Sequence, residues 1–122
     1  MARILVVFGT RPEAIKMFPV VHQLRATEGI ETLVAVTAQH RELLDQVLDI
    51  AGILPDVDLD LMRPDQGLAD LTARLITALH KLWARTRPDI VLVQGDTTSS
   101  FAGSLTAYYT HIPVGHIEAG LR

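Results

Sequence analysis

The residues best suited to chemistry gather in two short loops, each of which directly follows an apolar run. The first loop, residues 9–13 (GTRPE), starts at the first glycine of the chain. Thr10 and Glu13 have the T-x-x-E spacing of a helix capping box, and Pro12 is tolerated in a first helical turn. A helix that starts here offers backbone N–H groups to an anion, and the Arg11 guanidinium matches phosphate oxygens. The loop fits a diphosphate site, or equally a well-capped helix with a solvated arginine.

The second loop, residues 95–100 (GDTTSS), follows the apolar run 90–93. Asp96 is favoured as the N-cap of the next helix, because aspartate is among the best residues at that position. The alternative is a carboxylate that faces a crevice and acts as a base or accepts a hydrogen bond from a sugar hydroxyl. The residue type alone leaves both roles open.

Three more polar residues extend these candidate sites. His116 and Glu118 are two positions apart, so on a strand they would share one face. They could form an acid–base pair in which His116 orients Glu118, or provide two metal ligands. A third ligand is missing nearby, so we expect no metal site. Lys16 lies about one helical turn beyond Arg11 and is either a second phosphate cation or a surface residue.

Several classes of cofactor site are excluded by missing motifs. The chain has no cysteine, which rules out disulfides, iron–sulfur clusters and thiol nucleophiles. The P-loop pattern G-x-x-x-x-G-K-[ST] is absent, and G-x-G-x-x-G does not follow the first apolar run. We therefore expect neither a nicotinamide nor a flavin cofactor, while a phosphate or diphosphate ligand stays possible.

The composition is that of one ordinary globular domain. The chain has 122 residues, 48% apolar and 20% charged. Its formal net charge is −3, from 11 basic and 14 acidic residues, so the basic stripe of a nucleic-acid binder is missing. The apolar run 4–8 is too short for a membrane span or a secretory signal. We expect a soluble, cytoplasmic protein that binds neither nucleic acid nor membrane.

The elements that must position these loops alternate between strands and helices. This pattern predicts βαβ units around a parallel sheet with both faces covered, a doubly wound Rossmann-like α/β fold. A strand order of 3-2-1-4-5 would bring the two loops together at the carboxyl edge of the sheet. The chain stops just after a strand, so we expect it to be incomplete. The predicted strands are 3–8, 31–38, 56–62 (an edge strand or an extended connection), 90–93 and 114–117, and the predicted helices 13–26, 42–51, 68–84 and 98–109.

Four segments, in order along the whole chain, give it a specific resemblance to the non-hydrolysing UDP-N-acetylglucosamine 2-epimerases. They are Gly9-Thr10-Arg11-Pro12-Glu13, Thr37-Ala38-Gln39-His40-Arg41-Glu42, Gln94-Gly95-Asp96-Thr97-Thr98 and His116-Ile117-Glu118-Ala119-Gly120-Leu121-Arg122.

The resemblance implies a reversible conversion of UDP-N-acetylglucosamine to UDP-N-acetylmannosamine, by elimination and re-addition of UDP and without metal or redox cofactor. It also implies a homodimeric enzyme of cell-surface polysaccharide biosynthesis with two Rossmann-like domains in the GT-B arrangement. Residues 1–122 would be the N-terminal domain, and the C-terminal nucleotide-binding domain would be absent. A chain that forms only half of the substrate cleft would then turn over little or no substrate.

The resemblance also assigns roles to individual residues. It implies proton transfer at C2 for Asp96 and Glu118. The substrate-binding residues that it implies, around the nucleotide diphosphate and the sugar, are Arg11, Lys16, Thr10, Gly9 and His116. Gln39, His40 and Arg41 match a segment that lies beside an activating second substrate in some bacterial members, although the less basic residues 63–66 (RPDQ) argue against such activation here.

Three other interpretations stay open. The chain could belong to a hydrolysing relative that releases free N-acetylmannosamine, or to a GT-B glycosyltransferase. It could also be a non-catalytic module that binds nucleotide sugars, although such a module has no need of two crevice carboxylates.

Overall fold

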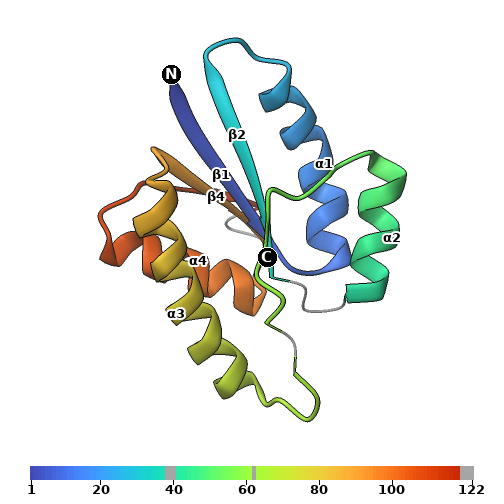
Figure 1. Ribbon diagram of the computed structural model, residues 1–122, viewed down its shortest axis with the longest axis vertical. Coiled ribbons are helices and arrows are strands. Elements are labelled where there is room, and N and C mark those ends of the chain that lie inside the picture. The colour runs from blue at the N-terminus through green and yellow to red at the C-terminus, as the bar shows by residue number, and fades with distance from the viewer. Residues whose placement is uncertain (38–40, 62, 119–122) are drawn as a thin grey trace.

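A computed structural model describes residues 1–37, 41–61 and 63–118, without the side chains of residues 41–43 (Figure 1). Strands and helices alternate along the chain, as the sequence pattern predicts. The strands are β1 (Ala2–Phe8), β2 (Ile30–Val36), β3 (Val57–Asp58), β4 (Ile90–Gln94) and β5 (Val114–Ile117). The helices are α1 (Arg11–Arg25), α2 (Arg41–Ala51), α3 (Leu68–Thr86) and α4 (Thr98–Tyr109).

The strands form one parallel sheet in the order β3-β2-β1-β4-β5. This is the predicted order, and it makes β1 and β4 neighbours in the middle of the sheet. The β1–β2 pairing runs in register from Ala2 with Ile30 to Phe8 with Val36. The loops after β1 and β4 therefore leave the same edge of the sheet side by side.

Among the boundaries that differ from the predictions, two have a clear physical reason. Helix α1 starts at Arg11 rather than at Glu13, because Thr10 already has the extended backbone of an N-cap. The third strand contains two residues instead of the predicted 56–62. Asp60 has a φ of +48°, which interrupts the extended backbone, and residues 59–61 belong to no helix or strand.

Helices cover both faces of the sheet, which confirms the predicted doubly wound architecture. Helices α1 and α2 pack on one face and α3 and α4 on the other (Figure 1). Along β1, Val6 and Phe8 join the core under α1 and α2, while Leu5 and Val7 join the core under α3 and α4. Successive residues of a strand point to opposite faces, so this short apolar run serves both cores.

Helix α3 buries most of its apolar face. Four leucines at helical spacing and the adjacent Trp83 lie in the core, whereas Leu68, the first residue of the helix, is 72% exposed. The Trp83 indole N–H donates a hydrogen bond to the Thr106 hydroxyl over 2.8 Å and links α3 to α4. None of the helices described is long and apolar enough to cross a membrane. The buried leucines are Leu71, Leu75, Leu79 and Leu82.

Gly9 lies where three elements converge. A Cβ atom at this position would be 1.9 Å from the Thr37 Oγ1 atom and 2.8 Å from the Ser99 Oγ atom. The two hydroxyls are buried and hydrogen-bonded to each other over 2.9 Å. The loop after β1 can lie against the end of β2 and the start of α4 only because residue 9 lacks a side chain.

We expect Gly9→Ala to lower the free energy of unfolding by about 1–3 kcal/mol, because the added methyl group overpacks a buried contact. Gly67→Ala is the matched control, since a Cβ atom there meets nothing within 4 Å. Gly67 is the N-cap of α3, and we expect a change within about 1 kcal/mol for that variant. Urea denaturation of the 122-residue chain measures both, and equal losses would contradict the packing argument.

Candidate active site at the carboxyl edge of the sheet

The predicted site residues that the structure describes come from three neighbouring elements at the carboxyl edge of the sheet. Arg11 and Lys16 lie on the first two turns of α1, and Asp96 lies in the loop between β4 and α4. Glu118 directly follows β5, which pairs with β4. Crevices at this edge of a doubly wound sheet are where such folds bind ligands.

The start of α1 is capped differently from the predicted capping box. Thr10 is the N-cap residue, but its side chain makes no capping hydrogen bond. Instead its hydroxyl donates to the Glu13 Oε1 atom over 2.8 Å, and the Gly9 N–H points at Oε2 over 3.4 Å. A capping box has two reciprocal hydrogen bonds, and only those accepted by the Glu13 side chain are present here. The Thr10 hydroxyl donates to the Glu13 carboxyl and so does not cap the helix.

Glu13 is the most unusual acidic side chain in the described part of the chain, because it is only 1% exposed. Burial raises the pKa of its carboxyl above the ordinary value of 4.5. Hydrogen bonds from the Thr10 and Thr97 side chains and from the Gly9 and Thr10 backbone act in the opposite direction on that pKa. Sequence reasoning treats this residue as a cap alone, since the T-x-x-E spacing contains no information about Thr97.

Asp96 is not a helix cap, so the favoured prediction is wrong. Thr97 is the N-cap of α4, and its hydroxyl accepts a hydrogen bond from the Ser100 N–H over 3.2 Å. Gly95 has a φ of +70° and turns the chain sharply after β4, which puts the cap one residue later than expected. The Asp96 side chain is exposed in the loop, and the second predicted role, a carboxylate in a crevice, fits this placement.

Glu118 is held by two partners from neighbouring elements. Its Oε1 atom lies 2.5 Å from the Lys16 ammonium of α1 and accepts a hydrogen bond over 2.6 Å from the Gln94 amide at the end of β4. Lys16 is therefore the partner of a carboxylate at the site edge rather than an isolated surface residue. Sequence reasoning missed Gln94, although it ends a buried strand as the one polar side chain of that strand.

The expectation that His116 and Glu118 share one face of a strand is wrong. Glu118 has a φ of +65° and lies past the end of β5, so the two-residue repeat of a strand does not apply to it. The Nε2 atom of the His116 ring is hydrogen-bonded to the Gly95 carbonyl over 2.6 Å. The ring thus contacts the loop that carries Asp96 rather than Glu118.

One cavity brings His116 and Asp96 together. Its volume is about 390 Å³, and it opens between the loop after β4 and the first turns of α4. Arg11 instead lines a separate cavity of about 380 Å³ between α1 and α2, together with Ile15 and Phe18. The residues that line the first cavity are Gly95, Asp96, Thr97, Ser100, Phe101, Ser104 and His116.

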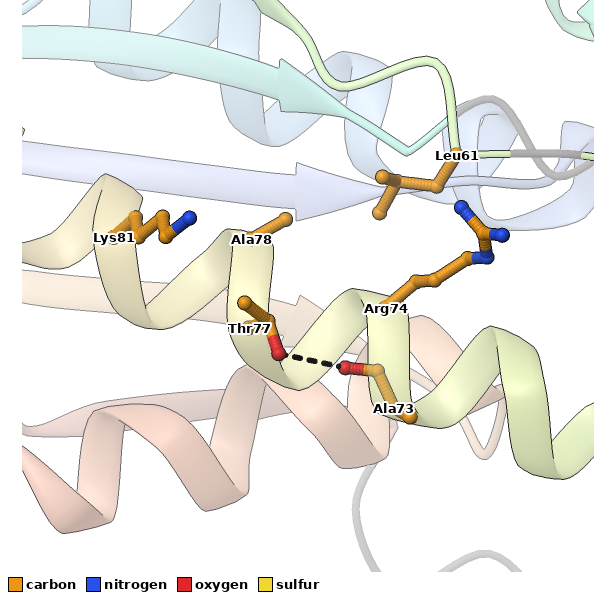
Figure 2. A pocket seen from close by; sticks show the side chains of 6 residues that line it. All are labelled: Leu61, Ala73, Arg74, Thr77, Ala78 and Lys81. Atoms are coloured by element: carbon orange, nitrogen blue, oxygen red, sulfur yellow. Dashed lines mark hydrogen bonds between the residues drawn. The ribbon is translucent and has the colours of Figure 1, made fainter.

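Another cavity of about 430 Å³ lies beside α3 and contains no predicted site residue. Figure 2 shows Leu61 over the helix, with the cationic side chains of Arg74 and Lys81 along it. The Thr77 hydroxyl donates to the Ala73 carbonyl over 3.1 Å and is satisfied within the helix.

Part of the predicted site lies outside the described residues. This applies to Gln39 and His40 and to the side chain of Arg41, so the possible allosteric segment stays a prediction. Within residues 1–37, 41–61 and 63–118, no three His, Asp or Glu side chains form a group that could hold a metal ion.

The buried Glu13 carboxyl makes stability depend on pH. Because its pKa is raised on folding, the folded chain binds this proton more tightly than the unfolded chain. The free energy of unfolding should therefore fall as pH rises from about 4.5 through the raised pKa. We expect Glu13→Gln to lack this decrease, and urea denaturation across that pH range measures it. The exposed Glu28→Gln is the control, and a wild-type advantage over Glu13→Gln that grew with pH would contradict the assignment.

Comparisons with known proteins agree with this fold. A protein family described as UDP-N-acetylglucosamine 2-epimerase matches residues 22–122. The UDP-N-acetylglucosamine 2-epimerase of Escherichia coli (strain K12) is 57% identical over 120 residues, which cover 98% of this chain and 32% of that protein. A crystal structure of UDP-GlcNAc 2-epimerase from Neisseria meningitidis bound to UDP-GlcNAc matches with a TM-score of 0.94 and 54% identity, over 98% of this chain and 32% of that one.

A more distant structure, a glycosyltransferase from Streptomyces sp. SF2575, shares the fold with a TM-score of 0.65 and 26% identity, over 95% of this chain and 39% of that one. The chain spans about a third of the length of the epimerases that it matches. The resemblance carried by the four sequence segments is thus confirmed at the level of the family: this chain belongs to the UDP-N-acetylglucosamine 2-epimerase family.

Proposed function

We propose that residues 1–122 are the N-terminal Rossmann-like domain of a cytoplasmic, homodimeric GT-B enzyme that interconverts UDP-N-acetylglucosamine and UDP-N-acetylmannosamine. A second domain completes the cleft around the nucleotide, so this chain alone turns over little or no substrate. Family membership supports the substrate class, and the relative from Neisseria meningitidis is described as bound to UDP-GlcNAc.

The observation that carries the proposal is the presence of two carboxylates in different surroundings at one edge of the sheet. Asp96 is exposed, makes no helix cap and lines a cavity. Glu118 is held by a lysine and an amide. Inversion at a carbon atom needs a group that removes a proton from one face and a group that returns a proton to the other. Two carboxylates whose surroundings differ are suited to divide those tasks.

The proposed reaction is balanced without an outside oxidant or reductant. A carboxylate removes the proton at C2, the bond from C1 to the diphosphate oxygen breaks, and a C1–C2 double bond forms. UDP leaves with the electron pair of the broken bond. In the second half, a proton is delivered to the opposite face of C2 while the diphosphate oxygen bonds to C1 again.

The departing diphosphate needs positive charge close by. The exposed Arg11 side chain and the N-terminus of α1 can supply it, since a guanidinium offers paired donors and the helix end carries a partial positive charge. Glu13 already engages the Gly9 and Thr10 amides. In this proposal Arg11 therefore provides more of the stabilisation than the amides of the loop.

We expect the full-length gene product to incorporate deuterium at C2 of UDP-N-acetylglucosamine in D₂O and to form the mannosamine epimer. Asp96→Asn and Glu118→Gln should each lower kcat by about 10²–10⁴-fold, because each removes a proton-transfer group. NMR of the C2 position measures exchange and epimer together.

Asp89→Asn is the matched control, because the same change is made on an exposed aspartate just before β4, at the opposite end of that strand. We expect it to retain wild-type kcat. Undiminished exchange in both Asp96→Asn and Glu118→Gln would contradict the proposed roles. The 122-residue chain, tested in parallel, should show no epimer.

Product analysis in the same experiment separates the alternatives. Retention of the UDP–sugar bond at equilibrium indicates an epimerase, and release of free N-acetylmannosamine indicates a hydrolysing relative. Transfer of the sugar to an acceptor would favour a glycosyltransferase, the activity named for the structure from Streptomyces sp. SF2575. Binding of UDP-N-acetylglucosamine without exchange or release would indicate a non-catalytic module.

A further inference from the structure

We propose that Gln94 is a positioning residue that keeps the Glu118 carboxylate at the site, while Lys16 is the partner that can leave it. The proposal rests on the proposed function of Glu118 in proton transfer. Gln94 is only 4% exposed, so it is not placed to touch substrate. Any effect of this residue on the reaction must therefore act through the group that its amide holds.

The backbone of the sheet does not by itself fix the Glu118 side chain. Glu118 follows the last residue of β5 and lies beyond the pairing of that strand with β4. Its φ of +65° lies in the left-handed region, which residues other than glycine rarely adopt. The side chain is 25% exposed, and its Oε1 atom makes the contacts with Lys16 and Gln94. These contacts therefore decide where the carboxylate stands.

Strand β4 carries the Gln94 side chain to the face of the sheet that α1 and α2 cover. Val91 and Val93 belong to the core under α3 and α4, whereas Leu92 packs against the core under α1 and α2. Side chains alternate along a strand, so Gln94 shares the face of Leu92. Its backbone is paired with Ile117, the last residue of β5. The amide thus lies beside the point where the chain leaves the sheet.

The hydrogen bond between the two side chains runs from the amide to the carboxylate. A carboxylate accepts and does not donate, so the Gln94 nitrogen must face it. The Nε2 atom of Gln94 lies 2.6 Å from the Glu118 Oε1 atom, and hydrogen bonds to charged acceptors are the shorter and stronger ones. Breaking this bond would be unfavourable, because the amide is buried and water barely reaches it.

Lys16 holds the same oxygen in a different way. Its side chain is 50% exposed and reaches Glu118 from α1 through a flexible four-carbon stem. An ion pair with a half-exposed lysine contributes little to stability, because water screens it. The ammonium group can therefore move towards an arriving diphosphate, whereas the buried amide at the end of β4 cannot follow. Gln94 is the contact that keeps Glu118 in place throughout the proposed reaction.

The first test compares Gln94→Met with two control variants in the full-length gene product. Methionine is unbranched like glutamine but has no N–H group, so it removes the donor and nearly keeps the shape. Gln23→Met makes the same change at an exposed position of α1. Thr106→Val breaks another buried hydrogen bond, the one from Trp83 to α4, and controls for a general loss of stability.

We expect Gln94→Met to lower kcat by about 10–100-fold, the range that a small misplacement of a reacting group can cause. The affinity for UDP alone should stay close to that of wild type, because UDP lacks the sugar on which Glu118 acts. Both controls should retain wild-type kcat. Wild-type kcat in Gln94→Met, or an equal loss in Gln94→Met and Thr106→Val, would overturn the proposal.

A double-mutant cycle with Glu118→Gln separates positioning from a local structural defect. If Gln94 acts through the Glu118 carboxylate, its substitution should cause no further loss once that carboxylate has been removed. We expect the double variant to have the kcat of Glu118→Gln. A defect that acts by another route would lower kcat by the same factor in both backgrounds, and that additive result would contradict the proposal.

A spectroscopic measurement tests the contact without epimerase activity and without any substitution at Gln94. In NMR spectra of the full-length gene product, the Gln94 side-chain N–H proton that faces Glu118 should resonate downfield of an ordinary glutamine amide, because it donates to a charged acceptor. Glu118→Ala should return this resonance to the ordinary range, whereas Glu28→Ala, at an exposed position, should leave it in place.

An unchanged Gln94 resonance in Glu118→Ala would overturn the proposal even if Gln94→Met does not fold. If the wild-type enzyme forms no epimer, the proposed function fails, and the spectroscopic measurement still decides whether Gln94 holds Glu118.

Discussion

The site depends on a buried polar contact at the point where three elements meet. Gly9 leaves room for the Thr37 and Ser99 hydroxyls, which are buried and hydrogen-bonded to each other over 2.9 Å. In the same loop as Gly9, the Thr10 hydroxyl donates to the buried Glu13 carboxyl. Burial of polar groups is unfavourable unless their hydrogen bonds are made, so the loop after β1 keeps its place only while these contacts are made.

This constraint explains why the two halves of the sheet meet so closely at their carboxyl edge. The order β3-β2-β1-β4-β5 makes β1 and β4 neighbours, so their loops converge wherever the helices are placed. Convergence alone would leave the loops free to slide past each other. The close approach of Gly9 to the buried Thr37–Ser99 pair removes that freedom, because it fixes the loop after β1 against the first turn of α4.

The fold could be predicted from the sequence because it is encoded in periodic patterns. Runs such as residues 4–8 carry apolar side chains to both faces of the sheet, and α3 repeats leucine at helical spacing. The details of the site depend on single backbone angles instead. The positive φ of Gly95 moves the helix cap from Asp96 to Thr97, and that of Glu118 takes its side chain off the strand face. Residue types at those positions permit either outcome, so the sequence could not decide between them.

In the proposed reaction, the Glu118 carboxylate and the diphosphate of the substrate would compete for the Lys16 ammonium group. The ammonium group lies 2.5 Å from the Glu118 carboxyl in the structure, and it projects from the same helix as Arg11. A lysine is a single mobile point charge, so it cannot neutralise a carboxylate and a diphosphate fully at once. An arriving diphosphate that drew Lys16 towards itself would leave Glu118 held by the Gln94 amide alone. Binding of the diphosphate would then exchange one of the two groups that hold Glu118, whereas the Gln94 amide at the end of β4 would keep the carboxylate in place at the edge of the sheet.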